Sequence, residues 1–115
     1  MGFLSTHVLD TAQGKPANGV NIRLYAVCES RTLVKSLTTN SDGRTNEELL
    51  SVDEFKFGIW ELVFNVGNYF SDSDLDCDTP PFLDEITLRF TISRDDHYHV
   101  PLLVSPWSYS TYRGS

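Results

Sequence analysis

The sequence has few basic residues and no long apolar stretch. It contains 9 Lys and Arg against 16 Asp and Glu, which gives a formal net charge of -7 at pH 7. Because proteins that bind nucleic acid present a basic face to the phosphates, this balance excludes nucleic acid as an expected partner. No segment approaches the roughly 20 consecutive apolar residues of a membrane helix, so we expect no membrane partner either.

Targeting signals are also absent from the sequence. The first ten residues, MGFLSTHVLD, contain neither a basic leader nor a long apolar run, so no secretory signal is predicted. The ending Arg113-Gly114-Ser115 differs from the Ser-Lys-Leu peroxisomal signal. We therefore expect a cytoplasmic protein, with a peroxisomal location left open.

Cysteine is scarce, and several catalytic motifs are missing. Without an oxidising compartment we expect no disulfide between the two cysteines, Cys28 and Cys77. Cys28 lies in an apolar, strand-like run and is predicted to pack as a small hydrophobic residue. The sequence has no glycine-rich phosphate loop, Gly-x-Ser-x-Gly elbow or paired-carboxylate motif. Because these motifs are missing, they point to no particular reaction.

What the sequence does contain is the alternation typical of β-strands. The 115 residues, 40% of them hydrophobic, are sufficient for one domain, 1–115, with its own core. Short alternating runs separated by turn residues predict an all-β fold, an antiparallel β-sandwich. The predicted strands are 3–9, 20–27, 33–39, 59–66, 85–94, 97–105 and 107–113.

One short helix is predicted after the strand 59–66. Ser71 can cap a helix, and Asp72 and Asp74 would then lie in the first turn, where negative side chains are favourable. Pro80-Pro81 would stop it. The helix is therefore expected to begin at Ser71 and to remain short.

The histidines are the first candidates for chemistry. His97 and His99 lie two residues apart and would share one face of a strand. Together with His7, Asp95 and Asp96 they could bind zinc, although no cysteine cluster or His-Glu motif supports a metal site. An isolated strand histidine such as His7 is more often half-buried and bonded to a neighbour, so a purely structural role stays open.

Further candidates lie in a turn and at the C-terminus. Arg44 directly follows the turn 40–43 and is either an ordinary exposed arginine or a clamp for a carbonyl or oxyanion, because guanidinium offers a planar fork of donors. Pro101 predicts an edge strand or a bulge. The aromatic residues between Trp107 and Tyr112 would not be left loose in water, so the tail is expected to pack rather than fray.

Three blocks of sequence together resemble the transthyretin-related family, and within it the 5-hydroxyisourate hydrolases. The blocks are 4–10 (LSTHVLD, followed by GKPA at 14–17), 39–45 (TNSDGRT) and 97–115, which ends in YRGS. The terminal YRGS is the most specific block, because the hormone-carrying transthyretins have a different tail. The resemblance covers nearly the whole chain.

The resemblance implies a transthyretin-like sandwich of two four-stranded sheets, assembled as a homotetramer (a dimer of dimers) with active sites in the channel between dimers. It also implies hydrolysis of 5-hydroxyisourate to 2-oxo-4-hydroxy-4-carboxy-5-ureidoimidazoline in urate (purine) degradation, without cofactor or metal. His97 matches a family position too, but we give it no catalytic role. The matching catalytic residues are His7, Arg44, His99 and Ser115, and the substrate-binding residues are His7, Arg44, Tyr112, Arg113 and Gly114.

These residues suggest a mechanism and leave one rival. His7 and His99 would position and deprotonate water, which requires one of them to be neutral. Arg44 would stabilise the oxyanion. The rival is a carrier of a small aromatic ligand in the same channel, which would be expected to be more apolar and to lack this set of residues.

Overall fold

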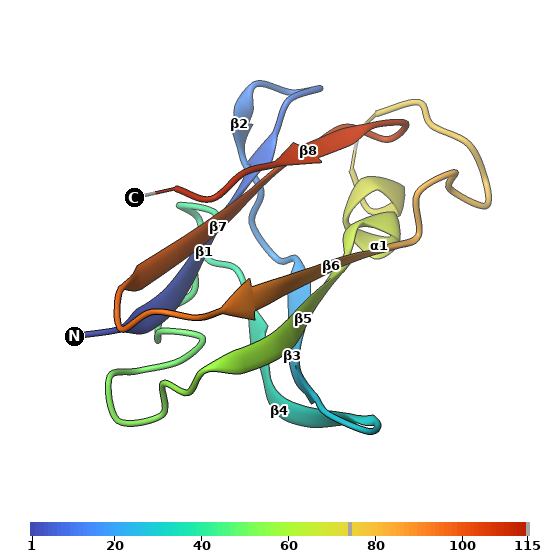
Figure 1. The fold of residues 1–115 in the computed structure, drawn as a ribbon. Helices are drawn as coiled ribbons and strands as arrows, with labels where there is room; N and C mark the ends of the chain where they lie inside the picture. Colours follow the sequence, from blue (N-terminus) through green and yellow to red (C-terminus); the bar gives the residue numbers. More distant parts are fainter. Residues whose placement is uncertain (74, 115) are drawn as a thin grey trace.

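The computed structural model, which describes residues 1–73 and 75–114, consists of two stacked β-sheets and one short helix (Figure 1). The predicted sandwich is therefore confirmed, and one additional, two-residue strand lies between the predicted strands 3–9 and 20–27. The strands are β1 (Phe3–Asp10), β2 (Lys15–Pro16), β3 (Asn21–Val27), β4 (Arg31–Thr38), β5 (Gly58–Asn65), β6 (Glu85–Ile92), β7 (His97–Val104) and β8 (Tyr109–Thr111), and the helix is α1 (Val66–Ser71).

Each sheet has four strands, in the orders β2-β1-β7-β8 and β4-β3-β5-β6. Neighbouring strands are antiparallel except for β1 and β7, which are parallel and pair along their full lengths, from Phe3↔His97 to Asp10↔Val104. Figure 1 shows these two strands, from opposite ends of the chain, side by side. This pairing brings the N-terminal and C-terminal histidine segments onto one sheet.

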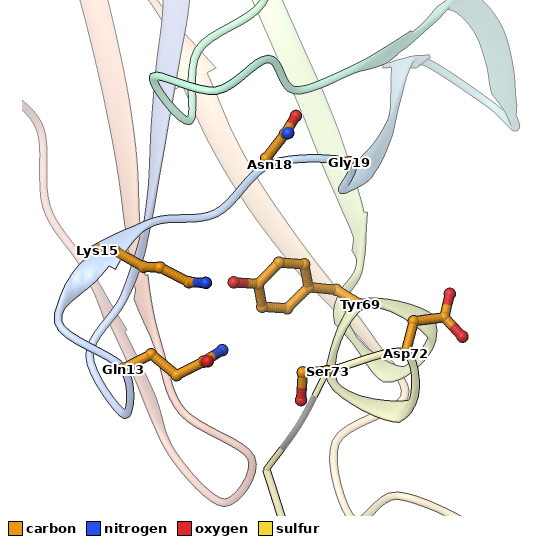
Figure 2. Close-up of a pocket in the computed structure, with 7 residues that line it drawn as sticks. All are labelled: Gln13, Lys15, Asn18, Gly19, Tyr69, Asp72 and Ser73. Atoms are coloured by element: carbon orange, nitrogen blue, oxygen red, sulfur yellow. The ribbon is translucent and has the colours of Figure 1, made fainter.

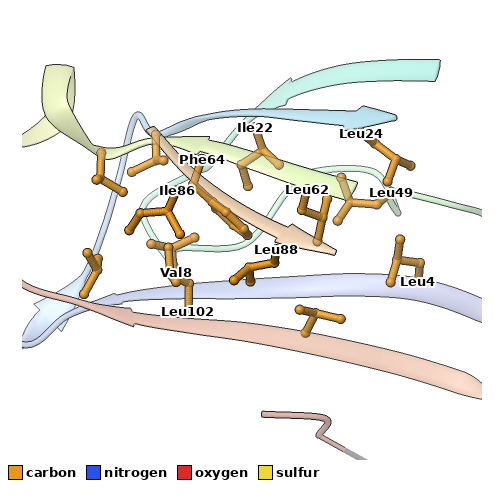
Figure 3. Packing of buried hydrophobic residues seen from close by; sticks show 14 of the residues in the cluster. Leu4, Val8, Ile22, Leu24, Leu49, Leu62, Phe64, Ile86, Leu88 and Leu102 are labelled. Atoms are coloured by element: carbon orange, nitrogen blue, oxygen red, sulfur yellow. The ribbon is translucent and has the colours of Figure 1, made fainter. Parts of the chain in front are cut away.

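The core lies between the two sheets and follows the alternation seen in the sequence (Figure 3). Leu4 and Val8 of β1 face residues of the other sheet such as Leu62 and Phe64, and all four are fully buried. Burial of a large apolar side chain stabilises a fold by about 1.5–3 kcal/mol. The inner faces therefore hold the sheets together and leave the outer face of the β1–β7 pair for other roles.

The helix lies before the predicted position: α1 ends at Ser71, where it was expected to begin. Its N-cap is Asn65, whose side chain accepts a hydrogen bond from the Asn68 N–H at 3.2 Å. Gly67, within the helix, packs so closely on Asp84 that a Cβ would lie 2.8 Å from the Asp84 carboxylate. The alternation of β5 continues past Asn65 into the helix, which is why the prediction was wrong. Among the described residues no helix is long and apolar enough to cross a membrane.

Pro101 does not lie in an edge strand or a bulge, because β7 has a neighbour on each side. β8 pairs with β7 as far as Leu102↔Thr111, and pairing resumes in the same register at the isolated bridge His99↔Gly114. Pro101 occupies the gap between these pairs, where its missing N–H interrupts no hydrogen bond of the ladder. The tail therefore leaves β7 after Thr111 and returns to it at Gly114.

Cys28 does not pack as predicted. It follows the last residue of β3 and is exposed, and its N–H donates to the Ser30 carbonyl at 3.1 Å. The apolar run ends one residue before the cysteine, so the side chain falls in the turn between β3 and β4. Cys28 and Cys77 are both free thiols.

Candidate active site

The outer face of the β1–β7 pair carries the three histidines. Ser5 and His7 are half-buried on this face of β1, while Thr6 between them is buried on the opposite face. His97 and His99 have the same orientation on β7. Because β1 and β7 are parallel and Ser5 pairs with His99, side chains from opposite ends of the sequence lie together on one surface.

A tight turn positions Arg44 beside the same face of the β1–β7 pair. Gly43 adopts a left-handed conformation (φ 74°), and its carbonyl accepts the Val8 N–H at 2.7 Å. A Cβ on Gly43 would lie 2.3 Å from the Val8 carbonyl oxygen, so only glycine allows this approach. The turn is closed by the Asn40 N–H, which donates to the Arg44 carbonyl at 2.7 Å. Since Val8 follows His7, docking of the turn brings Arg44 beside that histidine.

The pKa values of His7 and His99 are both lowered. Burial is the largest cause for each ring, and the positive charge of Arg44 is the second. The backbone and carboxylate of Asp42 partly oppose this shift in the pKa of His7, whereas His97 and His7 add to it for His99. Both rings are therefore mostly neutral at pH 7, the form of imidazole that accepts a proton.

The lowered pKa values give a direct prediction. In an NMR titration of the folded protein, the midpoints of His7 and His99 should both lie below the ordinary value of 6.5, because burial and Arg44 disfavour the charged ring. In urea both midpoints should return to about 6.5, where desolvation and the neighbouring charge are lost. A midpoint at or above 6.5 for either folded-state ring would contradict this electrostatic description.

Gly114 joins the C-terminal tail to the site. Its N–H donates to the His99 carbonyl at 2.7 Å, and a Cβ at this position would lie 2.8 Å from the Cδ2 atom of the His99 ring. Glycine therefore lets the tail lie flat against the histidine. Ser115, also predicted to be catalytic, lies outside the described residues.

The other two predicted tail residues face a different space. Tyr112 and Arg113 line a cleft of about 340 Å³ against β6. The Arg113 guanidinium pairs with Asp96 at 3.0 Å and lies 4.2 Å from the centroid of the Tyr98 ring. The described residues thus bring His7, His99, Arg44 and Gly114 together, and direct the Arg113 side chain elsewhere.

Sequence reasoning missed Ser5, which was not among the predicted site residues. The Ser5 hydroxyl lies 2.8 Å from ring nitrogens of both His97 and His99. No local signal could have revealed this contact, because the register between β1 and β7 joins residues more than 90 positions apart. Within the described part of the chain, no three His, Cys, Asp or Glu side chains are grouped as metal ligands.

A model of the HIUase/transthyretin family matches residues 4–114. This chain belongs to the HIUase/transthyretin family. The 5-hydroxyisourate hydrolase of Pseudomonas aeruginosa is 50% identical to it over 117 residues, a match that covers 100% of this chain and 93% of that protein. The resemblance noted in the sequence is therefore confirmed.

Solved structures agree with the family assignment. The structure of Klebsiella pneumoniae 5-hydroxyisourate hydrolase has a TM-score of 0.83 and 32% identity, covering 100% of both chains. A structure of (S)-allantoin synthase has a TM-score of 0.93 and 50% identity, covering 99% of this chain and 44% of that chain. This family member therefore corresponds in length to the Klebsiella hydrolase and to less than half of the (S)-allantoin synthase chain.

This member of the family has a second, polar cleft of about 360 Å³ between the β1–β2 turn and α1, shown in Figure 2. Asp10, buried beneath it, accepts hydrogen bonds at 2.7 Å from both the Tyr69 hydroxyl and the Gln13 side-chain amide. Burial, reinforced by Asp10, raises the pKa of Tyr69. Asp10 thus ties the turn to the helix. The lining contains none of the predicted site residues and consists of Gln13, Lys15, Asn18, Gly19, Tyr69, Asp72 and Ser73.

Proposed function

We propose that this protein is a 5-hydroxyisourate hydrolase and that its active site is the outer face of the β1–β7 pair. The observation that carries the proposal is the convergence of two neutral histidines, His7 and His99, with Arg44 on one surface. A base and a cation side by side suit the hydrolysis of a cyclic amide. Family members that are 50% or more identical to this chain and are named 5-hydroxyisourate hydrolase support the same activity.

In the proposed reaction, a water molecule attacks a ring carbonyl of the substrate. His7 and His99 position the water, and one of them takes its proton as the new C–O bond forms. Arg44 stabilises the negative charge that develops on the carbonyl oxygen. The ring C–N bond then breaks, the histidine returns the proton to the leaving nitrogen, and the product is 2-oxo-4-hydroxy-4-carboxy-5-ureidoimidazoline. No step uses a metal or a cofactor.

The tail residues are proposed to hold the substrate. Tyr112 and Gly114 would bind substrate, Gly114 where its backbone lies against His99. Ser115 would contribute hydroxyl or terminal carboxylate contacts as a catalytic residue. Arg113 would contribute through its backbone, because its side chain is engaged by Asp96. These assignments extend the family resemblance to the individual residues.

We further propose a homotetramer, a dimer of dimers, with the site in the channel between dimers. The supporting observation is the exposure of large aromatic side chains near the C-terminus, since Trp107 and Tyr112 are 53% and 60% exposed in the single chain. Exposed aromatic groups favour association. Light scattering coupled to size exclusion tests the assembly: a mass near four chains of 13.0 kDa supports it, and a monomer contradicts it.

The activity is tested with 5-hydroxyisourate generated freshly from urate by a urate oxidase. The decay of its ultraviolet absorbance is followed with and without the protein. We expect decay to accelerate in proportion to protein concentration, beyond the spontaneous rate. If folded protein leaves the rate unchanged, the hydrolase proposal fails and the carrier of a small aromatic ligand takes its place.

Arg44 offers a test of how the carbonyl is activated. We expect Arg44→Ala to lower kcat about 100-fold, the size of effect that follows loss of a group stabilising an oxyanion. Arg23→Ala is the matched control: Arg23 lies in the other sheet, paired with Glu85, and its loss should leave kcat unchanged. Equal kcat values for the two variants would argue against Arg44 as the clamp.

A further inference from the structure

The Ser5 hydroxyl lies between two imidazole rings. Its oxygen is 2.8 Å from Nε2 of His97 and 2.8 Å from Nδ1 of His99, both ordinary hydrogen-bond distances. All three groups are half-buried, and the contact rests on the parallel pairing of Ser5 with His99. The arrangement forms a short chain of hydrogen bonds that leads from the proposed base, His99, to a second titratable ring.

Counting protons shows what this chain of hydrogen bonds does. A serine hydroxyl has one proton, so it donates to one ring and accepts from the other when both rings are neutral. If Ser5 donates to His97, it accepts from the Nδ1–H of His99, and Nε2 of His99 is left without a proton. If the direction is reversed, Nε2 of His99 carries the proton and cannot act as a base. The hydroxyl therefore couples the tautomers of the two rings.

The His97 ring and the His99 ring have different neighbours. The His97 ring stacks on Phe3, with centroids 3.9 Å apart and an angle of 11°, and an aromatic face stabilises a cation. The Asp96 carboxylate accepts the His97 backbone N–H at 2.9 Å and also pairs with Arg113.

His99, in contrast, is partly desolvated and faces positive or titratable neighbours. Burial and the charge of Arg44 lower the pKa of His99, and His97 and His7 lower it further. A proton taken up by His99 is therefore better held elsewhere, and the hydroxyl of Ser5 offers the route.

We propose that Ser5 is a positioning residue that holds His99 with Nε2 free, and that it passes the Nδ1 proton of His99 to His97 when His99 deprotonates water. This inference rests on the proposed function for the role of His99. Three proton transfers occur together: from water to Nε2 of His99, from Nδ1 of His99 to the Ser5 oxygen, and from the Ser5 hydroxyl to Nε2 of His97. The products are hydroxide bonding to the substrate carbonyl and a His97 imidazolium. The reverse transfers then deliver a proton to the leaving nitrogen of the substrate. Over the whole reaction the protein therefore gains or loses no proton or electron.

The tautomer of His99 is measured first, in resting protein without substrate. Long-range nitrogen–proton NMR on protein labelled with ¹⁵N in histidine is expected to place the His99 proton on Nδ1, and Ser5→Ala should move it to Nε2. Ser5→Thr, which keeps a hydroxyl, should retain the Nδ1 proton. A wild-type proton on Nε2, or no change in Ser5→Ala, overturns the proposal. Because no substrate is used, these results stand whether or not the protein hydrolyses 5-hydroxyisourate.

Kinetics then separate positioning from proton transfer. Ser5→Ala should lower kcat about 10-fold with KM unchanged, and Ser5→Thr should recover most of that loss. Ser36→Ala, a serine substitution in the other sheet, is the matched control and should leave both constants unchanged. A rise in KM without a fall in kcat for Ser5→Ala would show substrate binding instead and would overturn the proposal.

A last variant isolates His97. In His97→Gln the amide still accepts the Ser5 hydroxyl proton but cannot become a cation at neutral pH. The His99 proton should therefore stay on Nδ1 while kcat falls about 10-fold. An unchanged kcat would overturn the transfer of the proton to His97.

Discussion

Replacing His99 by Asn is expected to lower kcat for 5-hydroxyisourate about 10³-fold, within the range for loss of a general base. The polar Asn amide extends about as far from the backbone as Nδ1 of the histidine ring that it replaces, but it cannot take a proton from water. The fold should be unaffected, because His99 is half-buried on the outer face and its backbone carbonyl, which binds Gly114, is retained. The measurement is single-turnover decay of substrate absorbance with thermal unfolding of the same preparation.

A comparison of the kcat losses in His99→Asn and His97→Gln makes this test more specific. His97→Gln, which keeps the hydrogen bond to Ser5, should lose only about 10-fold in kcat, because the proposed base is still present. If His99→Asn retains more than a tenth of the wild-type kcat, the base is not His99. If it loses its folded state or its assembly as well, the histidine is structural.

The sandwich could be predicted from local sequence because strands such as β1 and β6 alternate between buried and more exposed residues. Alternation of period two in 85–94 marks β6, and its inward residues are those that fill the core. The turn before Arg44 was equally readable, since Gly43 is the residue that a left-handed position requires. Such features depend on neighbours in the chain.

Features that depend on distant partners could not be predicted. Nothing within 3–10 or 97–104 specifies that these strands pair in parallel, and that register alone brings Ser5 to His99. Pro101 resembled a residue of an edge strand because its place in a gap of the β7–β8 ladder is set by the path of the tail. The contacts of the Arg113 side chain with Asp96 and Tyr98 likewise depend on the path of the tail beside β7.

Replacing Gly43 by Ala is expected to damage both the fold and the site. The new Cβ would lie 2.3 Å from the Val8 carbonyl oxygen, 3.1 Å from Cβ of Pro16 and 3.3 Å from the Ala17 nitrogen. Two of these atoms are backbone and the third is in a rigid ring, so no flexible side chain can move aside. Together with the left-handed φ of 74°, the clash should lower the free energy of unfolding by about 2–4 kcal/mol, measured by urea denaturation.

The same substitution should separate Arg44 from the histidines, because the turn can no longer dock on β1. We expect kcat/KM to fall about 100-fold or more, and the pKa of His7 to rise as the neighbouring positive charge withdraws. Gly14→Ala is the matched control: Gly14 also has a positive φ, 68°, but its Cβ would meet nothing within 4 Å. Gly14→Ala should lower the free energy of unfolding by about 1 kcal/mol, because alanine disfavours a positive φ, and it should leave kcat/KM unchanged. Equal stability losses in the two variants, or full activity in Gly43→Ala, would show that the close approach at Val8 does not position Arg44.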